Sequence, residues 1–220
     1  MVIQVKNCSF PAGSSLTLMG ADQVLPPSTS TFSLLQDETL RLVDLVEEVL
    51  ELARADAAHG RLDLQPTDLI PIIQATLETF SQRFAEKSIT LNVQYPENPL
   101  IAAVDPGRIA RVFRNLTDNA VRYTPENGGV SIHFIPAPGK IRVVYSNPSG
   151  ELNSSDLVFI FERFYRGEKS RSREHGGAGI GLSIVKELIE SHGGQVGAEL
   201  VGDQVDIWVE LPVVQPGNAV

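Results

Sequence analysis

The sequence predicts an α+β fold, a two-layer α/β sandwich in which helices cover one face of a largely antiparallel sheet, preceded by a long helix. From residue 68 the hydrophobic pattern follows the order helix, strand, helix, strand, strand, loop, helix, strand, strand. Strands that follow each other directly form hairpins, which favours antiparallel pairing. Upstream, apolar residues occupy the a and d positions of a heptad through 35–58, as in a helix that packs lengthwise against other helices.

Composition limits the classes of protein to consider. With 220 residues and 42% hydrophobic content, the chain can bury a full core. The formal charge of −9 argues against broad nucleic-acid binding, and the only basic stretch is 163–173. No apolar run reaches the roughly 18 to 20 residues of a membrane helix, and the N-terminus does not resemble a signal peptide. The single cysteine, Cys8, excludes an internal disulfide and favours a cytoplasmic protein.

Local patterns divide the chain into four parts. Residues 1–30 contain scattered Gly, Pro and Ser without a sustained period and are predicted to be irregular. The heptad helix through 35–58 ends before Gly60 and defines a helical segment, 31–63. The alternating helices and strands define a domain over 64–214, and residues 215–220 form a tail.

The elements of the domain follow from periodicity and turn signals. A helix is predicted from about Asp68 to Phe84, with Pro71 in its first turn. Asp105 and Pro106 supply the N-cap and first-turn proline of the next helix. The remaining predictions are strands over 89–95, 130–135 and 140–146, a helix over 181–191 closed by two glycines, and a final hairpin of 195–201 and 204–211.

The helix that begins near Asp105 carries amides at the edge of its buried face. At 100° per residue, its apolar side chains cluster on one side, and Asn115, Asn119 and Arg122 form a second stripe beside them. Amide oxygens there are suitable neutral ligands for Mg²⁺, and the Arg122 guanidinium suits phosphate oxygens. Alternatively, the two asparagines bond to local backbone groups or face water.

Three alternating glycines precede the last helix. Gly177, Gly179 and Gly181 allow backbone N–H groups to approach a polyphosphate, and the following helix directs its positive end toward it. The pattern differs from a dinucleotide fingerprint, because Leu182 occupies the third glycine position and no strand precedes it. Alternatively, the three glycines merely form a flexible turn.

Together these segments resemble a known family. The stretches "NLTDNAVRYTP", "FERFYRG" and "GGAGIGLSIVKELIESHGG" occur in the order of the N box, F box and second glycine box of two-component sensor histidine kinases. The resemblance covers about residues 64–213, which implies the catalytic ATP-binding domain with the Bergerat fold. The helix at 35–58 resembles the second helix of the kinase dimerisation hairpin, here without its histidine box.

The resemblance implies a site for ATP and Mg²⁺. By this resemblance, Asn115 and Asn119 would hold the metal, and Arg122 would bind phosphate. Arg166, in the lid between the F box and the second glycine box, would reach the terminal phosphate. The implied cofactor-binding residues are Tyr123, Asn147, Gly177, Gly179, Gly181 and Leu182. Phe161 and Phe164 would anchor the lid, and plain core packing is the alternative for both.

The sequence departs from the family pattern in two places. Asn147 stands where most of these kinases carry the aspartate that accepts a hydrogen bond from adenine; its amide oxygen can still accept one, more weakly. No histidine box is present, and the four histidines, at 59, 133, 175 and 192, do not match one. The expected partners are therefore a histidine phosphoacceptor domain outside this chain, a response regulator, and a second copy in a homodimer through the helix at 35–58.

Three functions remain open on the sequence. The first is the catalytic domain of a sensor kinase, transferring the γ-phosphoryl group to a histidine elsewhere. The second is a non-catalytic regulator that binds ATP or nothing and acts through protein contacts. The third is an ATPase or anti-sigma-type serine kinase. The amide at Asn115 disfavours hydrolysis because it cannot accept a proton from water, although Asp118 nearby keeps that alternative open.

Overall fold

The computed structural model describes residues 18–20, 23–25, 62–150, 152–165 and 179–213. The chain divides into two units, Met1–Glu47 and Glu48–Val220. In the first unit, β1 (Leu18–Gly20) and β2 (Gln23–Leu25) pair antiparallel. A hairpin therefore occurs within the segment predicted to be irregular, because strands of 3 residues are too short to show a period. The helix predicted through 35–58 lies outside the described residues.

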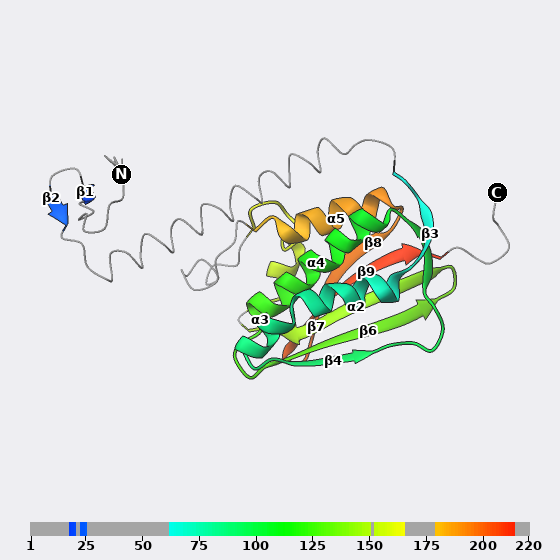
Figure 1. Cartoon of the computed structure of the whole chain (residues 1–220), viewed down its shortest axis with the longest axis horizontal. Helices are drawn as coiled ribbons and strands as arrows, with labels where there is room; N and C mark the ends of the chain where they lie inside the picture. The colour runs from blue at the N-terminus through cyan, green and yellow to red at the C-terminus, as the bar shows by residue number, and fades with distance from the viewer. Residues whose placement is uncertain (1–17, 21–22, 26–61, 151, 166–178, 214–220) are drawn as a thin grey trace, which may run out of the picture. The chain divides into compact units, whose positions relative to one another are not determined.

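The second unit is built on a five-stranded sheet in the order β4-β6-β7-β9-β8 (Figure 1). Its strands are β4 (Thr90–Gln94), β6 (Gly129–Ala137), β7 (Lys140–Pro148), β8 (Gln195–Val201) and β9 (Gln204–Pro212). β4 runs parallel to β6, and the other neighbouring pairs are antiparallel. Both predicted hairpins and the largely antiparallel sheet are confirmed.

Helices cover one face of this sheet, as predicted. They are α2 (Leu69–Thr79), α3 (Ser81–Glu86), α4 (Pro106–Tyr123) and α5 (Gly181–Ser191). Figure 1 shows α2, α4 and α5 side by side over the sheet, with α4 in the middle. None of the helices in the described ranges combines the length and the apolar character needed to cross a bilayer.

Two further features, both in the second unit, differ from the prediction. The helix expected to continue to Phe84 breaks at Phe80, which ends α2 and begins α3. Periodicity missed this break because Phe80 and Phe84 are both buried, so the apolar face continues across it. In addition, β3 (Gln65–Asp68) pairs antiparallel with β5 (Ile101–Val104) in a second small sheet. The "QPTD" sequence of β3 has no apolar alternation that would predict a strand.

Hydrogen bonds join the start of α4 to the end of α5. Asp105 caps α4, since its side chain accepts from the N–H of Arg108 at 3.2 Å, and Pro106 follows in the first turn as predicted. His192, buried at the end of α5, accepts through Nε2 from the N–H of Asp105 at 3.0 Å. Its Nδ1 lies 2.7 Å from the carbonyl oxygen of Leu188, so Nδ1 carries the proton. These contacts fix the start of α4 against the end of α5.

α4 also supplies the centre of the core. Its predicted apolar residues are all 1% exposed or less: Ile109, Val112, Phe113, Leu116 and Ala120. They pack against the sheet and against α2 and α5. Because this face is fully buried, the amide stripe beside it is held at the rim of the core.

Candidate functional site

The amide stripe and the glycine segment meet where α4 and α5 pack together. A Cβ added to Gly181, the first residue of α5, would lie 3.3 Å from Oδ1 of Asn115. The Nδ2 group of Asn115 donates to the carbonyl oxygen of Arg111 at 2.9 Å, which leaves the amide oxygen turned toward the start of α5. Leu182, the next residue of α5, packs half-buried against the core. The structure thus brings Asn115 and Gly181 together.

The other residues of the stripe lie further along α4. Asn119, Arg122 and Tyr123 are half-buried. Nη2 of Arg122 lies 3.2 Å from Oδ2 of Asp118. The second carboxylate oxygen, Oδ1, accepts from Nη1 of Arg83 at 2.6 Å. Since both oxygens already have guanidinium partners, Asp118 is poorly suited to act as a base on water.

Asn147 places a buried oxygen without a partner at the end of β7. The residue is 2% exposed, and its Nδ2 group donates to the carbonyl oxygen of Pro148 at 3.0 Å. Its Oδ1 atom accepts no hydrogen bond among the described residues. An unpaired buried acceptor costs about 1–3 kcal/mol, so a ligand or a water that donates a hydrogen bond to this oxygen would be favoured. The hydroxyl of Thr124, just after α4, is likewise buried without a partner in the described part of the chain.

A hydrogen bond joins the two described residues Phe164 and Gly179, which lie just before α5 in the structure. The N–H of Phe164 donates to the carbonyl oxygen of Gly179 at 3.0 Å. Gly179 has φ +74, a left-handed conformation that glycine adopts without strain. Residues 166–178, which include the predicted site residues Arg166 and Gly177, lie outside the described ranges.

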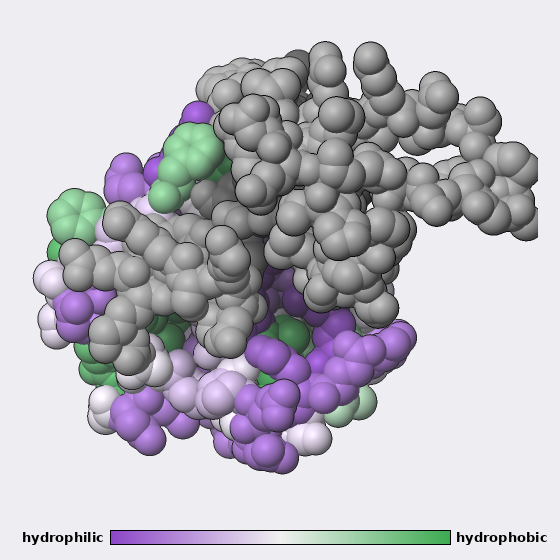
Figure 2. Space-filling model, turned by 90° about the vertical axis from the view of Figure 1, so that its left-hand side faces the viewer, coloured by the Kyte–Doolittle hydropathy of each residue, from purple (hydrophilic) through white to green (hydrophobic). Residues whose placement is uncertain are grey.

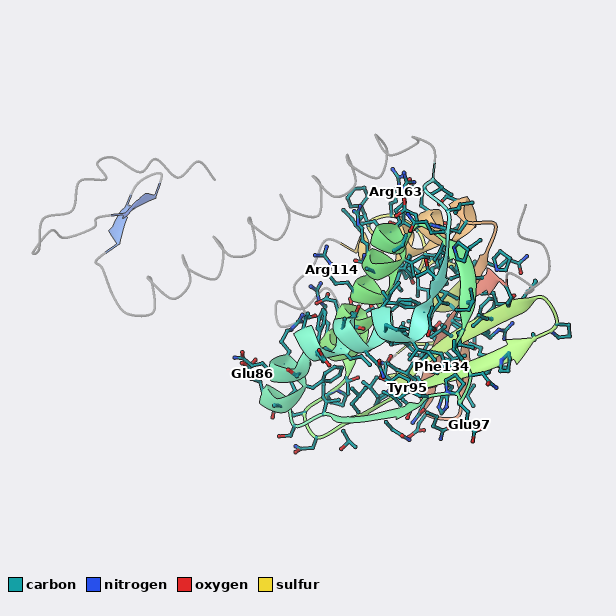
Figure 3. All side chains as sticks on the ribbon, turned by 45° about the vertical axis from the view of Figure 1, so that its right-hand side comes forward. Glu86, Tyr95, Glu97, Arg114, Phe134 and Arg163 are labelled. Carbon is teal, nitrogen blue, oxygen red and sulfur yellow. The ribbon has the colours of Figure 1, made fainter. Side chains whose placement is uncertain are left out.

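Ion pairs attach the segment 152–165 to α5. Arg163 Nη2 lies 3.1 Å from Oε2 of Glu187, and Lys186 Nζ lies 3.4 Å from Oε1 of Glu162. Figure 3 shows Arg163 next to α5. These pairs are partly exposed, so each contributes little to stability on its own. Together they hold the segment 152–165 against α5.

A second contact orders the same segment internally. The Tyr165 hydroxyl donates to Oδ1 of Asp156 at 2.6 Å, and the N–H of Asn153 donates to Oδ2 at 2.9 Å. Both bonds favour the ionised carboxylate, and they lower the pKa of Asp156, the Tyr165 bond more than the Asn153 bond.

The two phenylalanines of this segment differ in burial. Phe161 is half-buried against the core, as the packing alternative expects. Phe164 is 62% exposed, and core packing does not explain it. Val158 and Phe159 are exposed as well, at 71% and 49%. Figure 2, which views the molecule from the left-hand side of Figure 1, shows exposed hydrophobic side chains in green among hydrophilic ones in purple.

Sequence reasoning missed Arg83 and Thr124. Arg83 lies 35 residues before Asp118, and a polar residue in a short helix has no local pattern that identifies its distant partner. The only available signal was the spacing of Arg83 and Lys87, two cations four residues apart on one helix turn. Thr124 is a single residue in a turn, and only its burial in the structure distinguishes it.

Comparison with known proteins gives consistent results. A family model described as histidine kinase-, DNA gyrase B-, and HSP90-like ATPase matches residues 104–215. The signal transduction histidine-protein kinase BaeS of Escherichia coli (strain K12) is 32% identical over 87% of this chain. The sensor protein VanS of Enterococcus faecium is 32% identical over 81% of it. The aligned regions span only 41% and 46% of these two relatives, less than half of their length.

Solved structures show the same similarity. The catalytic domain of the histidine kinase ThkA is 25% identical with a TM-score of 0.60, covering 68% of this chain and 95% of that domain. ThkA in complex with the response regulator protein TrrA has a TM-score of 0.68 at 25% identity, covering 84% of this chain and 51% of ThkA. Full-length ShkA in complex with AMPPNP has a TM-score of 0.66 at 30% identity, covering 83% of this chain and 38% of ShkA.

Proposed function

Since the chain belongs to the histidine kinase-, DNA gyrase B-, and HSP90-like ATPase family, we propose that it is the Mg·ATP-binding catalytic domain of a sensor histidine kinase. In this role it supplies the γ-phosphoryl group to a histidine outside this chain. The two relatives compared above are sensor kinases, and the ThkA catalytic domain has a similar fold. Because ATP is a cytoplasmic nucleotide, the proposal also places this domain, residues 64–214, in the cytoplasm.

The observation that carries the proposal is the buried Oδ1 atom of Asn147. One N–H of its Nδ2 group donates to the carbonyl oxygen of Pro148, and the Oδ1 atom is an acceptor without a partner in the described residues. The exocyclic amino group of adenine is a donor, whereas guanine presents a carbonyl oxygen at the equivalent position. Asn147 therefore favours adenine over guanine, although its neutral oxygen makes a weaker bond than a carboxylate.

The phosphates would lie between α4 and α5. Asn115 and Asn119 offer neutral amide oxygens for Mg²⁺, which prefers oxygen ligands and retains several waters. Arg122 adds a guanidinium for phosphate, and the start of α5 at Gly181 offers backbone N–H groups. Bound Mg²⁺ would neutralise charge on the transferring phosphoryl group, so catalysis consists of positioning and electrostatic stabilisation. Asn115 lies next to Gly181, which supports this arrangement.

The remaining site residues complete the proposal. Tyr123 and Leu182 would border the nucleotide, and Gly177 and Gly179 would contribute to the phosphate cradle with Gly181. Arg166 would reach the terminal phosphate from the segment before α5.

Transfer is favoured over hydrolysis. An amide at Asn115 cannot take a proton from water, and the carboxylate of Asp118 is already paired with two guanidinium groups. ThkA has been crystallised with the response regulator TrrA, which supports a response regulator as the downstream partner of this chain. A histidine phosphoacceptor domain would receive the phosphoryl group first.

Calorimetric titration of the chain tests nucleotide binding. We expect Mg·ATP and a non-hydrolysable analogue to bind, and Mg·GTP to bind far more weakly. Replacing Asn147 with alanine should weaken Mg·ATP binding about tenfold, the effect of one buried hydrogen bond. An Asn119→Ala variant should lose the Mg²⁺ dependence of binding. Equal binding of ATP and GTP, or unchanged Mg²⁺ dependence in that variant, would contradict the proposed site.

Incubation with labelled ATP and a separately supplied acceptor domain tests the chemistry. Transfer of label to the acceptor histidine supports the kinase. Binding without transfer would instead identify a non-catalytic regulator, and release of phosphate by the chain alone would identify an ATPase.

A further inference from the structure

Charged side chains link α3 to the last turn of α4. Arg83 Nη1 lies 2.6 Å from Oδ1 of Asp118, and Oδ2 of the same carboxylate lies 3.2 Å from Nη2 of Arg122. We propose that Arg83 and Asp118 are positioning residues that hold Arg122 for phosphate, which makes α3 part of the phosphate-binding apparatus. This inference rests on the proposed function for the role of Arg122.

Arg83 is itself held in place. Its guanidinium carbon lies 5.2 Å from the centre of the Phe80 ring, and Phe80 is buried at the junction of α2 and α3. A guanidinium over an aromatic face is attracted by the ring electrons. The stacked ring and the carboxylate therefore limit the rotamers of Arg83, which makes it a defined partner for Asp118.

Lys87 holds the backbone of the same turn. Its Nζ donates to the carbonyl oxygens of Val121 at 2.9 Å, Arg122 at 3.1 Å and Thr124 at 2.8 Å. Burial, and then the nearby charge of Arg83, lowers the pKa of Lys87. Figures 1 and 3 show α3, which ends at Glu86, beside the C-terminal end of α4. The backbone of Arg122 is thus held by Lys87, while its side chain is held through Asp118.

Arg83 also changes the net charge of the group that it forms with Asp118 and Arg122. Asp118 carries one negative charge between two guanidinium groups, so the three side chains together are positive. Without Arg83, Asp118 and Arg122 would form a neutral pair, and the carboxylate would compete with phosphate for Arg122. Arg83 satisfies the carboxylate and leaves Arg122 able to bind an anion.

Nucleotide affinities of matched variants test the inference. Arg83→Ala should weaken Mg·ATP binding about fivefold, between the effect of an exposed ion pair and that of a lost guanidinium–phosphate bond. Adenosine, which lacks phosphates, should bind equally to both proteins, and Arg83→Lys should restore part of the affinity. The control is Gln82→Ala, in the same helix. The Gln82 amide donates to Glu86 at 2.8 Å, and this variant should bind Mg·ATP like wild type.

A double-mutant cycle shows whether Arg83 acts through Arg122. In an Arg122→Ala background, Arg83→Ala should have no further effect on Mg·ATP affinity. An equal loss in both backgrounds, or an equal loss for adenosine, would overturn the positioning role.

A measurement without nucleotide separates this inference from the proposed function. The ¹⁵N–¹H signal of the Arg122 guanidinium should show restricted motion in wild type and faster motion in Asp118→Asn, which retains the shape of the side chain. In Arg83→Ala the signal should shift, because Asp118 then pairs with Arg122 alone. An unchanged Arg122 signal with only a lower melting temperature would show that Arg83 merely joins the helices. Failure of wild type to bind Mg·ATP would instead refute the proposed function, whatever the Arg122 signal shows.

Discussion

Lys87 combines two roles at the scale of a single residue. The last carbonyl groups of a helix have no partner within it, and three carbonyl oxygens at the end of α4 accept from the Lys87 ammonium group. The same side chain joins the end of α3 to α4, because Lys87 follows Glu86 directly. A lysine here therefore stabilises both the helix end and the contact between the two helices.

Replacing Lys87 with methionine tests this role. The methionine retains most of the apolar stem but cannot donate to the three carbonyl oxygens, so we expect a loss of about 2 kcal/mol in the free energy of unfolding, measured by urea denaturation. Lys186→Met is the control. Lys186 forms a partly exposed ion pair at 3.4 Å with Glu162, and the loss of this pair should cost less than about 0.5 kcal/mol. Equal losses for the two variants would show that the three bonds add no net stability.

At the scale of elements, a charged pair fixes the register of β7 against β9. Arg142 and Glu210 lie directly opposite each other, and Arg142 Nε donates to Oε1 of Glu210 at 2.9 Å. Lys140 Nζ lies 3.3 Å from Oε2, and the Arg142 guanidinium carbon lies 4.1 Å from the centre of the Trp208 ring. Since a slip of one residue would move these side chains to opposite faces, the group favours the observed register.

This pair predicts a dependence of stability on pH. The Arg142 hydrogen bond, more than the contacts with Lys140, lowers the pKa of Glu210 below its ordinary 4.5. A carboxyl with a lowered pKa stabilises the fold above its unfolded value, and this contribution is lost as the pH falls through the folded value. Glu210→Gln should therefore be less stable than wild type by about 1 kcal/mol at pH 7.

Urea denaturation at pH 7 and below pH 4.5 tests the direction of this pH dependence. The difference in unfolding free energy between wild type and Glu210→Gln should shrink as the pH is lowered below 4.5. A difference that stayed constant with pH would mean that the ionised form of Glu210 is not the stabilising one.

At the scale of the whole molecule, α4 couples the core to the candidate site. One face of this helix fills the centre of the core, while Asn115, Asn119 and Arg122 lie along its rim. A ligand held by that rim and by the start of α5 would bind only when the helices are packed on the sheet. Mg·ATP should therefore stabilise the folded second unit as a whole.

Thermal unfolding measures this coupling. At a ligand concentration of about 100 times Kd, the stabilisation should be about 2.7 kcal/mol, a rise of roughly 5 to 10 °C in Tm for a chain of this size. The rise should require both Mg²⁺ and ATP in wild type and should lose its Mg²⁺ dependence in Asn119→Ala. A Tm unaffected by Mg·ATP would argue that this chain does not bind the nucleotide.

Much of the fold could be predicted because its signals are local. Periodicity and glycines predicted α5 over 181–191, and the Asp105 cap with Pro106 predicted the start of α4. The apolar face of α4 was also predicted correctly, since a helix of known period presents a known set of residues to the core. The candidate site was predicted as motifs, and their residue roles remain predictions for the experiments above.

Features that depend on residues far apart in the sequence were decided only by the tertiary structure. The pairing of β3 with β5, the break at Phe80, the exposure of Phe164 and the ion pair of Arg83 with Asp118 all belong to this class. The physical reason is that helix period, capping and turn conformation depend on neighbouring residues, whereas the partner of a polar side chain or an edge strand depends on which elements pack together. The sequence by itself therefore determined most of the elements of the domain and indicated the family, and the packing of α3 against α4 decided which charges surround Arg122.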